Sequence, residues 1–96
     1  MVSTYDEYID AKKKFFSKHK NDWQVDTQGQ SAEYYRKTYT FKDGAVWYEV
    51  MTYTTETEKV EIKKCKVNVT VELMRIEYWN TDNGESNYYY EPWKVN

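Results

Sequence analysis

The sequence has little of what many functional classes require. Its 96 residues include one cysteine, one proline and three glycines. A single cysteine, Cys65, cannot form an intrachain disulfide, which indicates a reducing compartment. Three isolated glycines exclude a glycine-rich phosphate-binding loop. No apolar run approaches the roughly 20 residues of a membrane-spanning helix, and the acidic, polar start of the chain is unlike a signal peptide.

A large charge of one sign is also lacking. Fourteen Lys and Arg face sixteen Asp and Glu, for a formal net charge of −2. This balance argues against a nucleic-acid-binding protein, although lysines cluster within residues 12–20 and 59–66. We therefore expect a cytoplasmic protein without membrane association or direct nucleic-acid binding.

Candidate catalytic and metal-binding residues are scarce. His19 and Cys65 are the single histidine and the single cysteine, so no paired spacing for zinc exists. His19 falls on the apolar side of a predicted helix, where a packing role is expected. Cys65 is in phase with alternating valines, which predicts a small buried side chain; the alternative is a thiol activated by the neighbouring lysines. We predict no metal, no cofactor and no enzymatic activity.

The hydrophobic core must be built mainly from aromatic side chains. Leu, Ile, Val and Phe make up only about 17% of the chain, below the level typical of folded proteins. Aromatic residues reach 19%, with 11 Tyr, 4 Trp and 3 Phe, and each buried ring removes on the order of 150–250 Å² from water. A single folded domain over residues 1–96 follows from this length and composition.

A helix is predicted over residues 4–20. Thr4 and Glu7 have the spacing of a capping box. Acidic residues fill the first turns and lysines the last, which complements the helix dipole. Asn21 and Asp22 are expected to end it. Its apolar positions recur at three- and four-residue spacing: Tyr5, Tyr8, Ile9, Phe15, Phe16 and His19.

The rest of the chain alternates as strands do. Strands are predicted at 23–27, 33–41, 45–55, 60–79 and 86–94, with a loop at 28–31, a turn at 56–59 and tight hairpins at Asp43-Gly44 and Asn83-Gly84. The phase of the alternation changes within residues 60–79, which indicates bulges or a bend; a turn at Lys63-Lys64 is the alternative. Pro92 places the last strand at a sheet edge.

These elements define an α+β fold. Short connections make neighbouring strands antiparallel, so we expect an N-terminal helix packed on a bent antiparallel sheet of about five strands, in the order α-β-β-β-β-β. The element order resembles the cystatin-like and NTF2-like layouts. That resemblance implies, as an alternative function, a pocket for a small ligand.

The aromatic surplus predicts a docking surface. One helix cannot cover both faces of a five-stranded sheet, so some rings must remain uncovered. Alternation places Tyr88 and Tyr90 on one face and Tyr89 on the other. Exposed aromatic residues near carboxylates are typical of protein-binding surfaces; cross-strand stabilisation of a solvent-facing sheet is the alternative. The candidate partner-binding residues are Tyr78, Trp79, Asp82, Glu85, Tyr88, Tyr89, Tyr90 and Trp93.

The function predicted from these features is inhibition by binding. A small, acidic, aromatic-rich chain without catalytic sets resembles in type the phage-encoded inhibitors of bacterial defence, including anti-CRISPR proteins. The resemblance implies a viral protein in the bacterial host cytoplasm that blocks a protein partner, such as a nuclease or its nucleic-acid complex. A further alternative is a homo-oligomeric structural protein that pairs through its edge strand.

Overall fold

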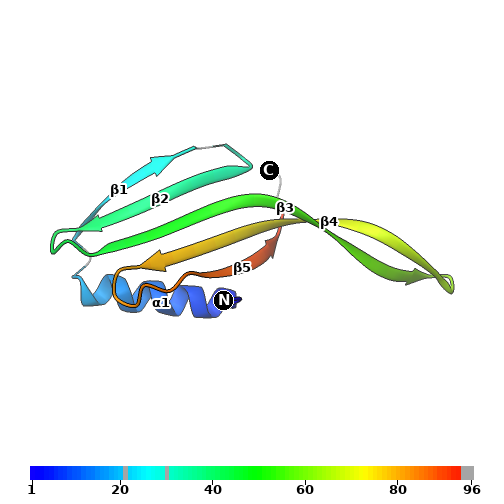
Figure 1. Ribbon diagram of the computed structural model, residues 1–96, viewed down its shortest axis with the longest axis horizontal. Helices are drawn as coiled ribbons and strands as arrows, with labels where there is room; N and C mark the ends of the chain where they lie inside the picture. Colours follow the sequence, from blue (N-terminus) through cyan, green and yellow to red (C-terminus); the bar gives the residue numbers. More distant parts are fainter. Residues whose placement is uncertain (21, 30, 94–96) are drawn as a thin grey trace.

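The computed structural model describes residues 1–20, 22–29 and 31–93, which form a helix followed by five strands. The strands make one open antiparallel sheet in the order β1-β2-β3-β4-β5, each beside its neighbour in sequence (Figure 1). This confirms the predicted α+β fold and its element order. The elements are α1 Tyr5–Lys18, β1 Trp23–Gln28, β2 Tyr34–Phe41, β3 Val46–Ile62, β4 Cys65–Asn80 and β5 Asn87–Pro92.

The helix begins as the capping box predicts. The Thr4 hydroxyl accepts a hydrogen bond from the Glu7 N–H at 3.1 Å, and the Glu7 carboxylate accepts one from the Thr4 N–H at 3.2 Å. The helix ends at Lys18, with His19 as its C-cap. Asn21 of the predicted end signal, residue 30 of the predicted loop and residue 94 of the predicted last strand lie outside the described residues.

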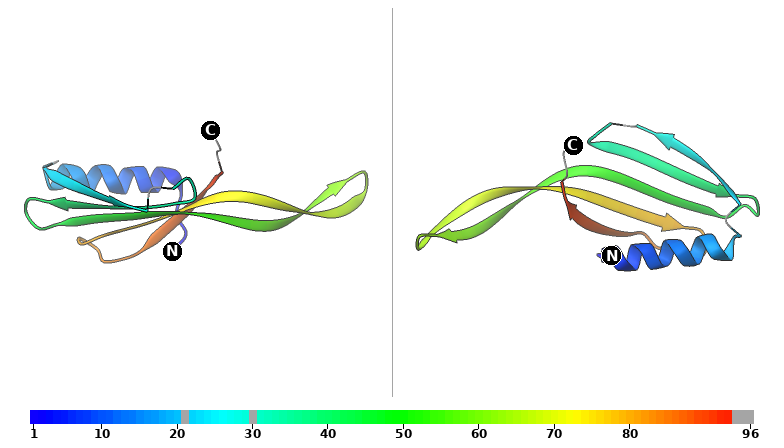
Figure 2. Two further views of the ribbon diagram at one scale, coloured as in Figure 1. Left: turned by 90° about the horizontal axis from the view of Figure 1, so that it is seen from above. Right: turned by 180° about the vertical axis from the view of Figure 1, so that it is seen from behind.

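A long hairpin gives the molecule its shape. β3 and β4 have 17 and 16 residues, more than their neighbours can cover, so residues 55–72 extend beyond the sheet as a two-stranded arm (Figures 1 and 2). The remainder is called the body. The radius of gyration is 16.7 Å, against about 12.5 Å for a compact chain of this length. The extents are 58 × 25 × 20 Å.

Two local predictions about this hairpin are wrong. The turn expected at 56–59 is absent, because β3 continues through these residues in pairing with β4. The bulges expected in residues 60–79 are also absent, because one register holds from Trp47↔Asn80 to Ile62↔Cys65. The alternative, a turn at Lys63-Lys64, is confirmed: both lysines have positive φ angles, 49° and 64°, as a two-residue type I′ turn requires.

The change of phase in the hydrophobic alternation arises because the apolar residues of β4 switch from one face of the sheet to the other. In the body, the even positions Met74, Ile76 and Tyr78 of β4 belong to the core side of the sheet. Towards the tip, the apolar residues of β4 occupy odd positions, from Leu73 to Val67. Because side chains alternate along a strand, the apolar side of the arm is opposite to the core side of the body.

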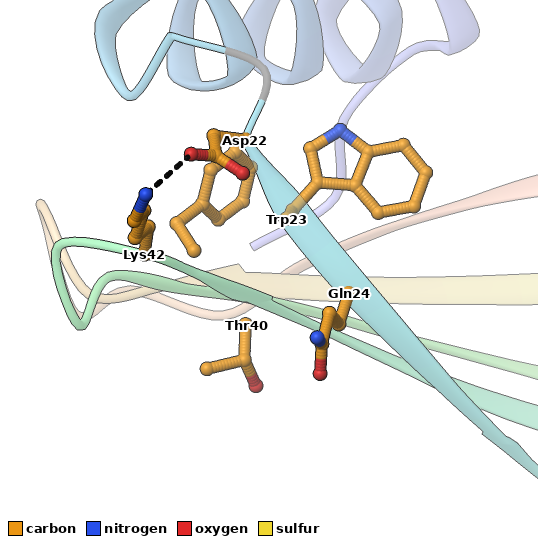
Figure 3. Close-up of a pocket in the computed structure, with 6 residues that line it drawn as sticks. Asp22, Trp23, Gln24, Thr40 and Lys42 are labelled. Atoms are coloured by element: carbon orange, nitrogen blue, oxygen red, sulfur yellow. Dashed lines mark ion pairs between the residues drawn. The ribbon is translucent and has the colours of Figure 1, made fainter.

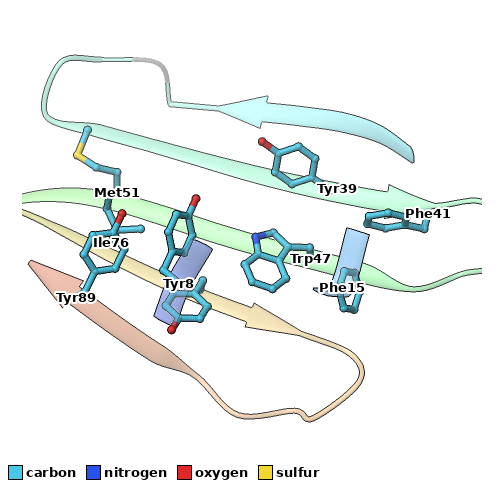
Figure 4. Packing of buried hydrophobic residues seen from close by; sticks show 9 residues of the cluster. Tyr8, Phe15, Tyr39, Phe41, Trp47, Met51, Ile76 and Tyr89 are labelled. Carbon is cyan, nitrogen blue, oxygen red and sulfur yellow. The ribbon is translucent and has the colours of Figure 1, made fainter. Parts of the chain in front are cut away.

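The core lies between α1 and one face of the sheet, here called the helix face (Figure 2). Trp47 is at its centre with no exposed surface, and its indole stacks on the Tyr78 ring at 5.6 Å. Aromatic rings supply most of this core, as the composition predicts. The buried apolar residues are Tyr8, Phe15, Tyr39, Phe41, Trp47, Met51, Ile76, Tyr78 and Tyr89 (Figure 4).

A carboxylate is also buried in this core. Glu49 is 3% exposed. It accepts hydrogen bonds from the Tyr8 hydroxyl at 2.6 Å and from Trp47 Nε1 at 3.2 Å, and it forms an ion pair with Lys12 at 3.4 Å. The three partners satisfy the charge that burial would otherwise make costly.

The sheet edge at β5 agrees with the prediction from Pro92. The N-terminal residues run beside this edge: the Ser3 N–H donates to the Tyr88 carbonyl at 2.7 Å, and the Tyr88 N–H donates to the Met1 carbonyl at 3.0 Å. These bonds cover part of the edge of β5. They also hold the start of the chain next to the helix face.

Candidate functional site

The sheet face opposite α1, here called the open face, carries a second set of aromatic residues. No described element packs over it (Figure 2). Strand alternation and the register assign its members. Its aromatic residues are Tyr34, Tyr48, Trp79, Tyr88 and Tyr90, and its charged residues in the body are Asp26, Arg36, Arg75 and Glu77.

Contacts among these side chains hold the open face in order. Tyr48 is directly opposite Trp79 across β3 and β4. The Arg75 guanidinium lies 4.4 Å from the centre of the Tyr88 ring and donates a hydrogen bond to the Glu77 carboxylate at 2.7 Å. Tyr88 in turn meets Tyr90 edge to face at 5.7 Å. The arrangement fixes rings and a guanidinium in place before any partner binds, which lowers the entropic cost of docking.

The open face leaves large rings accessible to a partner. Tyr34 is 39% exposed and Tyr90 is 40% exposed, one on each side of the body. Tyr48, Trp79 and Tyr88 are half-buried between them. The prediction that one helix cannot hide all the rings is therefore confirmed.

Three of the predicted partner-binding residues lie together on this face: Trp79, Tyr88 and Tyr90. Tyr78 and Tyr89 do not lie on it, because they are buried in the core, 4% and 2% exposed. The reason is the period of two: each neighbours an open-face residue in sequence and so points towards α1.

The other three predicted residues lie away from the open-face cluster. Trp93 follows β5 and packs edge to face on Tyr53 at 5.0 Å. Asp82, in the turn between β4 and β5, pairs with Lys18 at 3.4 Å and with His19 at 3.2 Å. Glu85 is exposed in the same turn. Asp82 thus has a structural role, and Glu85 stands at the rim of the molecule.

The predicted set omitted Tyr34, Tyr48 and Arg75. Each is separated by many residues from the Tyr88–Tyr90 segment, and only the strand register brings them onto one face. The alternation of Tyr34 and Tyr48 against Tyr35 and Trp47 was the available signal. It places both tyrosines on the face away from the core once Trp47 is known to be buried.

His19 joins the helix end to two hairpin turns. Its ring packs on Phe15 at 4.5 Å and Phe41 at 5.6 Å, which confirms the predicted packing role. Nδ1 pairs with Asp43 at 2.5 Å and Nε2 with Asp82 at 3.2 Å. Both ring nitrogens are thus held by carboxylates, so neither is free to take a proton from a nucleophile. The two nitrogens point in opposite directions, and the carboxylates they hold do not converge on one point.

This pairing predicts a pH dependence. The Asp43 hydrogen bond, with a further contribution from Asp82, raises the pKa of His19 above its ordinary value. Because the pKa of His19 is raised in the folded state, its pairing with the carboxylates contributes fully to stability below about pH 6.5, the pKa of histidine in the unfolded chain. This contribution is lost as the pH rises through the pKa of His19 in the folded state. We expect urea unfolding midpoints to fall between pH 6 and pH 8, and the His19→Gln variant to lack this fall. A midpoint that rises over this interval, or an equal fall in the variant, would contradict the assignment.

Cys65 departs from its prediction. It is in phase with Val67, Val69 and Val71, as expected, but it is exposed. The reason is that the apolar side of the arm is opposite to the side of the sheet on which α1 packs, and no described element covers it. Cys65 is therefore a surface thiol at the arm tip.

A hollow of about 320 Å³ lies where β1 begins (Figure 3). Trp23 and Phe41 contribute apolar surface, and the exposed pair Asp22 and Lys42 bridges one side at 3.9 Å. Gln24 and Thr40 complete the lining. The hollow is on the edge of the sheet, where Gln24 and Thr40 belong to the open-face side. Its mixed lining provides no enclosed apolar chamber of the kind that binds small ligands.

No family model, curated protein or solved structure matches this chain. Among the described helical residues, none form a helix long and apolar enough to cross a membrane.

Proposed function

We propose that the protein is a non-enzymatic binding domain whose open face docks on a protein partner and blocks the partner's surface. The observation that carries the proposal is the open face itself, with five aromatic residues and Arg75 on a surface that no described element covers. Tyr, Trp and Arg are the residues most enriched among those that dominate protein–protein binding energy.

The charge of the open face favours a protein over a nucleic acid. Arg36 and Arg75 are balanced by Asp26 and Glu77, so the face is neutral, and the whole chain carries −2. Binding to a phosphate backbone depends on an excess of positive charge, which this face lacks. The specific partner we propose is a nuclease of bacterial defence. A nuclease binds nucleic acid through a basic surface, and the net charge of −2 on this chain favours an encounter with such a surface.

The alternative of a small-ligand pocket has less support. It needs a sheet that curls around the ligand, whereas this sheet is open and its helix face is filled by α1. The hollow near β1 lies at the edge of this open sheet and not inside a curled one. A ligand there would contact an exposed ion pair and few rings.

The test compares two edge tyrosines with a matched control. The protein is immobilised, partners are captured from a bacterial lysate, and the affinity of the retrieved protein is measured for each variant. The double variant Tyr34→Ser/Tyr90→Ser should weaken binding at least tenfold, which corresponds to a combined loss of about 1.4 kcal/mol from the two rings. Tyr5→Ser should leave the affinity unchanged, because Tyr5, 51% exposed, is on α1.

The proposed blocking role also requires that binding inhibits the partner. The activity of the retrieved partner should fall on addition of the wild-type protein and should be retained with the double variant. Equal binding by wild type and double variant, at unchanged near-ultraviolet circular dichroism, would refute docking through the open face. Binding without any effect on the partner's activity would refute the blocking role.

A further inference from the structure

The outer edge of β4 in the arm is unpaired among the described residues. The described pairing of β5 with β4 reaches Leu73↔Pro92, and the Trp93 N–H donates to the Glu72 carbonyl at 3.0 Å. From residue 71 to residue 65, the one strand of the described residues that pairs with β4 is β3. Backbone groups alternate between the two sides of a strand. Because Glu72 points its carbonyl outward, Lys66, Asn68 and Thr70 present their N–H and C=O groups at the free edge.

The arm has the properties of an exposed sheet edge that pairs with a further strand. A two-stranded hairpin is marginally stable in water without further cover. The side chains of Val67, Val69 and Val71 lie on the same side of β4. Val67 is 39% exposed, and Ile62 on the facing strand β3 is 53% exposed. A long exposed edge with apolar side chains is a template for strand pairing.

We propose that the free edge of β4 pairs with the same edge of a second copy of this chain. The two strands would run antiparallel about a twofold axis at Asn68, and the arms would merge into a four-stranded sheet of order β3-β4-β4-β3. Val67 then lies opposite Val69 of the second copy, and Cys65 lies opposite its Val71. This inference is independent of the function proposed for the open face.

The backbone selects this register. Outward-pointing residues must meet outward-pointing residues, which restricts the pairing to even positions facing even positions. An axis at Asn68 pairs Asn68 with itself and Lys66 with Thr70, so all three outward residues donate and accept a bond. Shifting the axis towards the body would place Lys66 opposite Glu72, whose carbonyl is already bonded to Trp93.

Charge selects a second copy of β4 rather than of β3. In the proposed register Lys66 lies diagonal to Glu72 of the second copy, within reach of its long side chain. The corresponding segment of β3 contains Glu56, Glu58 and Glu61, and symmetric pairing of that edge would bring like charges together. The contact is also closed, because the same surface is used on both copies, so it ends at a dimer.

The first test uses proline to block one edge at a time. Asn68→Pro removes an outward N–H from β4, whereas Thr57→Pro removes an outward N–H from the β3 edge, two residue pairs nearer the body. Proline is tolerated at such edge positions within one chain. Sedimentation velocity should give twice the 11.7 kDa chain mass for wild type and Thr57→Pro, and the chain mass for Asn68→Pro. A wild type that remains monomeric at all concentrations, or a dimer lost only in Thr57→Pro, would overturn the proposal.

The second test traps the register covalently. In the proposed pairing, Val71→Cys faces the native Cys65 of the other copy, in a non-hydrogen-bonded pair about 4.5 Å apart between Cα atoms, a separation that a disulfide spans. Mild oxidation should link this variant into a dimer. Thr70→Cys, on the other side of the strand, should stay unlinked. Equal cross-linking in both variants, or none in Val71→Cys, would show that any dimer has a different register and would overturn the inference.

Discussion

Replacing Trp47 with alanine is expected to lower the free energy of unfolding by about 3–5 kcal/mol. Trp47 is fully buried, and its indole contacts rings from both α1 and β4, including Phe15 at 5.6 Å and Tyr78 at 5.6 Å. Its removal leaves a cavity that the surrounding rigid rings cannot fill. Glu49 also loses the indole N–H that satisfies its buried carboxylate. Urea unfolding followed by far-ultraviolet circular dichroism measures the loss.

The matched control is Trp79→Ala on the open face. Trp79 is half-buried beside Tyr48 on a face that no described element covers, so its truncation removes a cross-strand pair and creates no cavity. We expect a loss of about 1 kcal/mol. Trp47→Phe should fall between the two alanine variants, because it keeps a ring in the core. Equal losses for the two alanine variants would mean that the two faces of the sheet are equally covered, against the structure.

Local signals predicted the parts of the fold that local contacts build. The capping box of Thr4 and Glu7 is complete within one helical turn. The turns at Asp43-Gly44 and Asn83-Gly84 place glycine at positive φ, 93° and 67°, a conformation that glycine adopts without steric cost. Each of these features depends on residues close together in sequence, so the sequence alone is sufficient to find them.

The arm could not be found in this way. Where β3 ends depends on whether β4 continues to pair with it, and the turn that joins them contains two lysines in place of the usual Asn-Gly or Asp-Gly. Non-glycine residues at positive φ are uncommon, so the Lys63-Lys64 turn carries no strong sequence signal. The polar residues at 56–59 suggested a break, whereas they continue the exposed strand.

The candidate site was predicted in part for a similar reason. Alternation correctly separates Tyr88 and Tyr90 from Tyr89, but it does not say which set faces the helix. That choice is made by long-range packing, in which Tyr8 of α1 contacts Tyr89 and Tyr78, each at 5.1 Å between ring centres. The assembly of the open face from β2, β3, β4 and β5 likewise depends on register.

The tyrosine-rich core predicts steep alkaline unfolding. Burial raises the pKa of Tyr39 to about 12. Burial, followed by the negative charge of Glu49, raises the pKa of Tyr8 well above its ordinary value, and burial followed by the charge of Glu91 does the same for Tyr89. Unfolding releases these three hydroxyls to ionise at about pH 10. Above that pH the unfolded chain binds fewer protons than the folded one, so stability falls as the pH rises.

The size of the effect follows from the number of tyrosines. Each of the three contributes about 1.36 kcal/mol per pH unit between its unfolded and folded pKa values, so together they give about 4 kcal/mol per unit. Burial also raises the pKa of Tyr35, which adds to this slope. A domain with a stability of about 5–15 kcal/mol would lose most of it within two or three units above pH 10. Stability measured by urea unfolding from pH 9 to pH 12, with ionisation followed by tyrosinate absorbance near the midpoint, gives the slope.

A single hydroxyl tests the origin of this slope. Tyr8→Phe should reduce it by about 1.36 kcal/mol per pH unit, the contribution of one ionising group. The same variant should cost about 1.5–3 kcal/mol at neutral pH, because it removes a hydrogen bond to a charged group, the Glu49 carboxylate at 2.6 Å. Tyr5→Phe alters a half-exposed ring of the same helix and should leave the slope unchanged. If Tyr8→Phe and the wild type lost stability with the same slope, the proton held by Tyr8 would not be the one that unfolding releases, and the buried Tyr8–Glu49 pair would have to be abandoned.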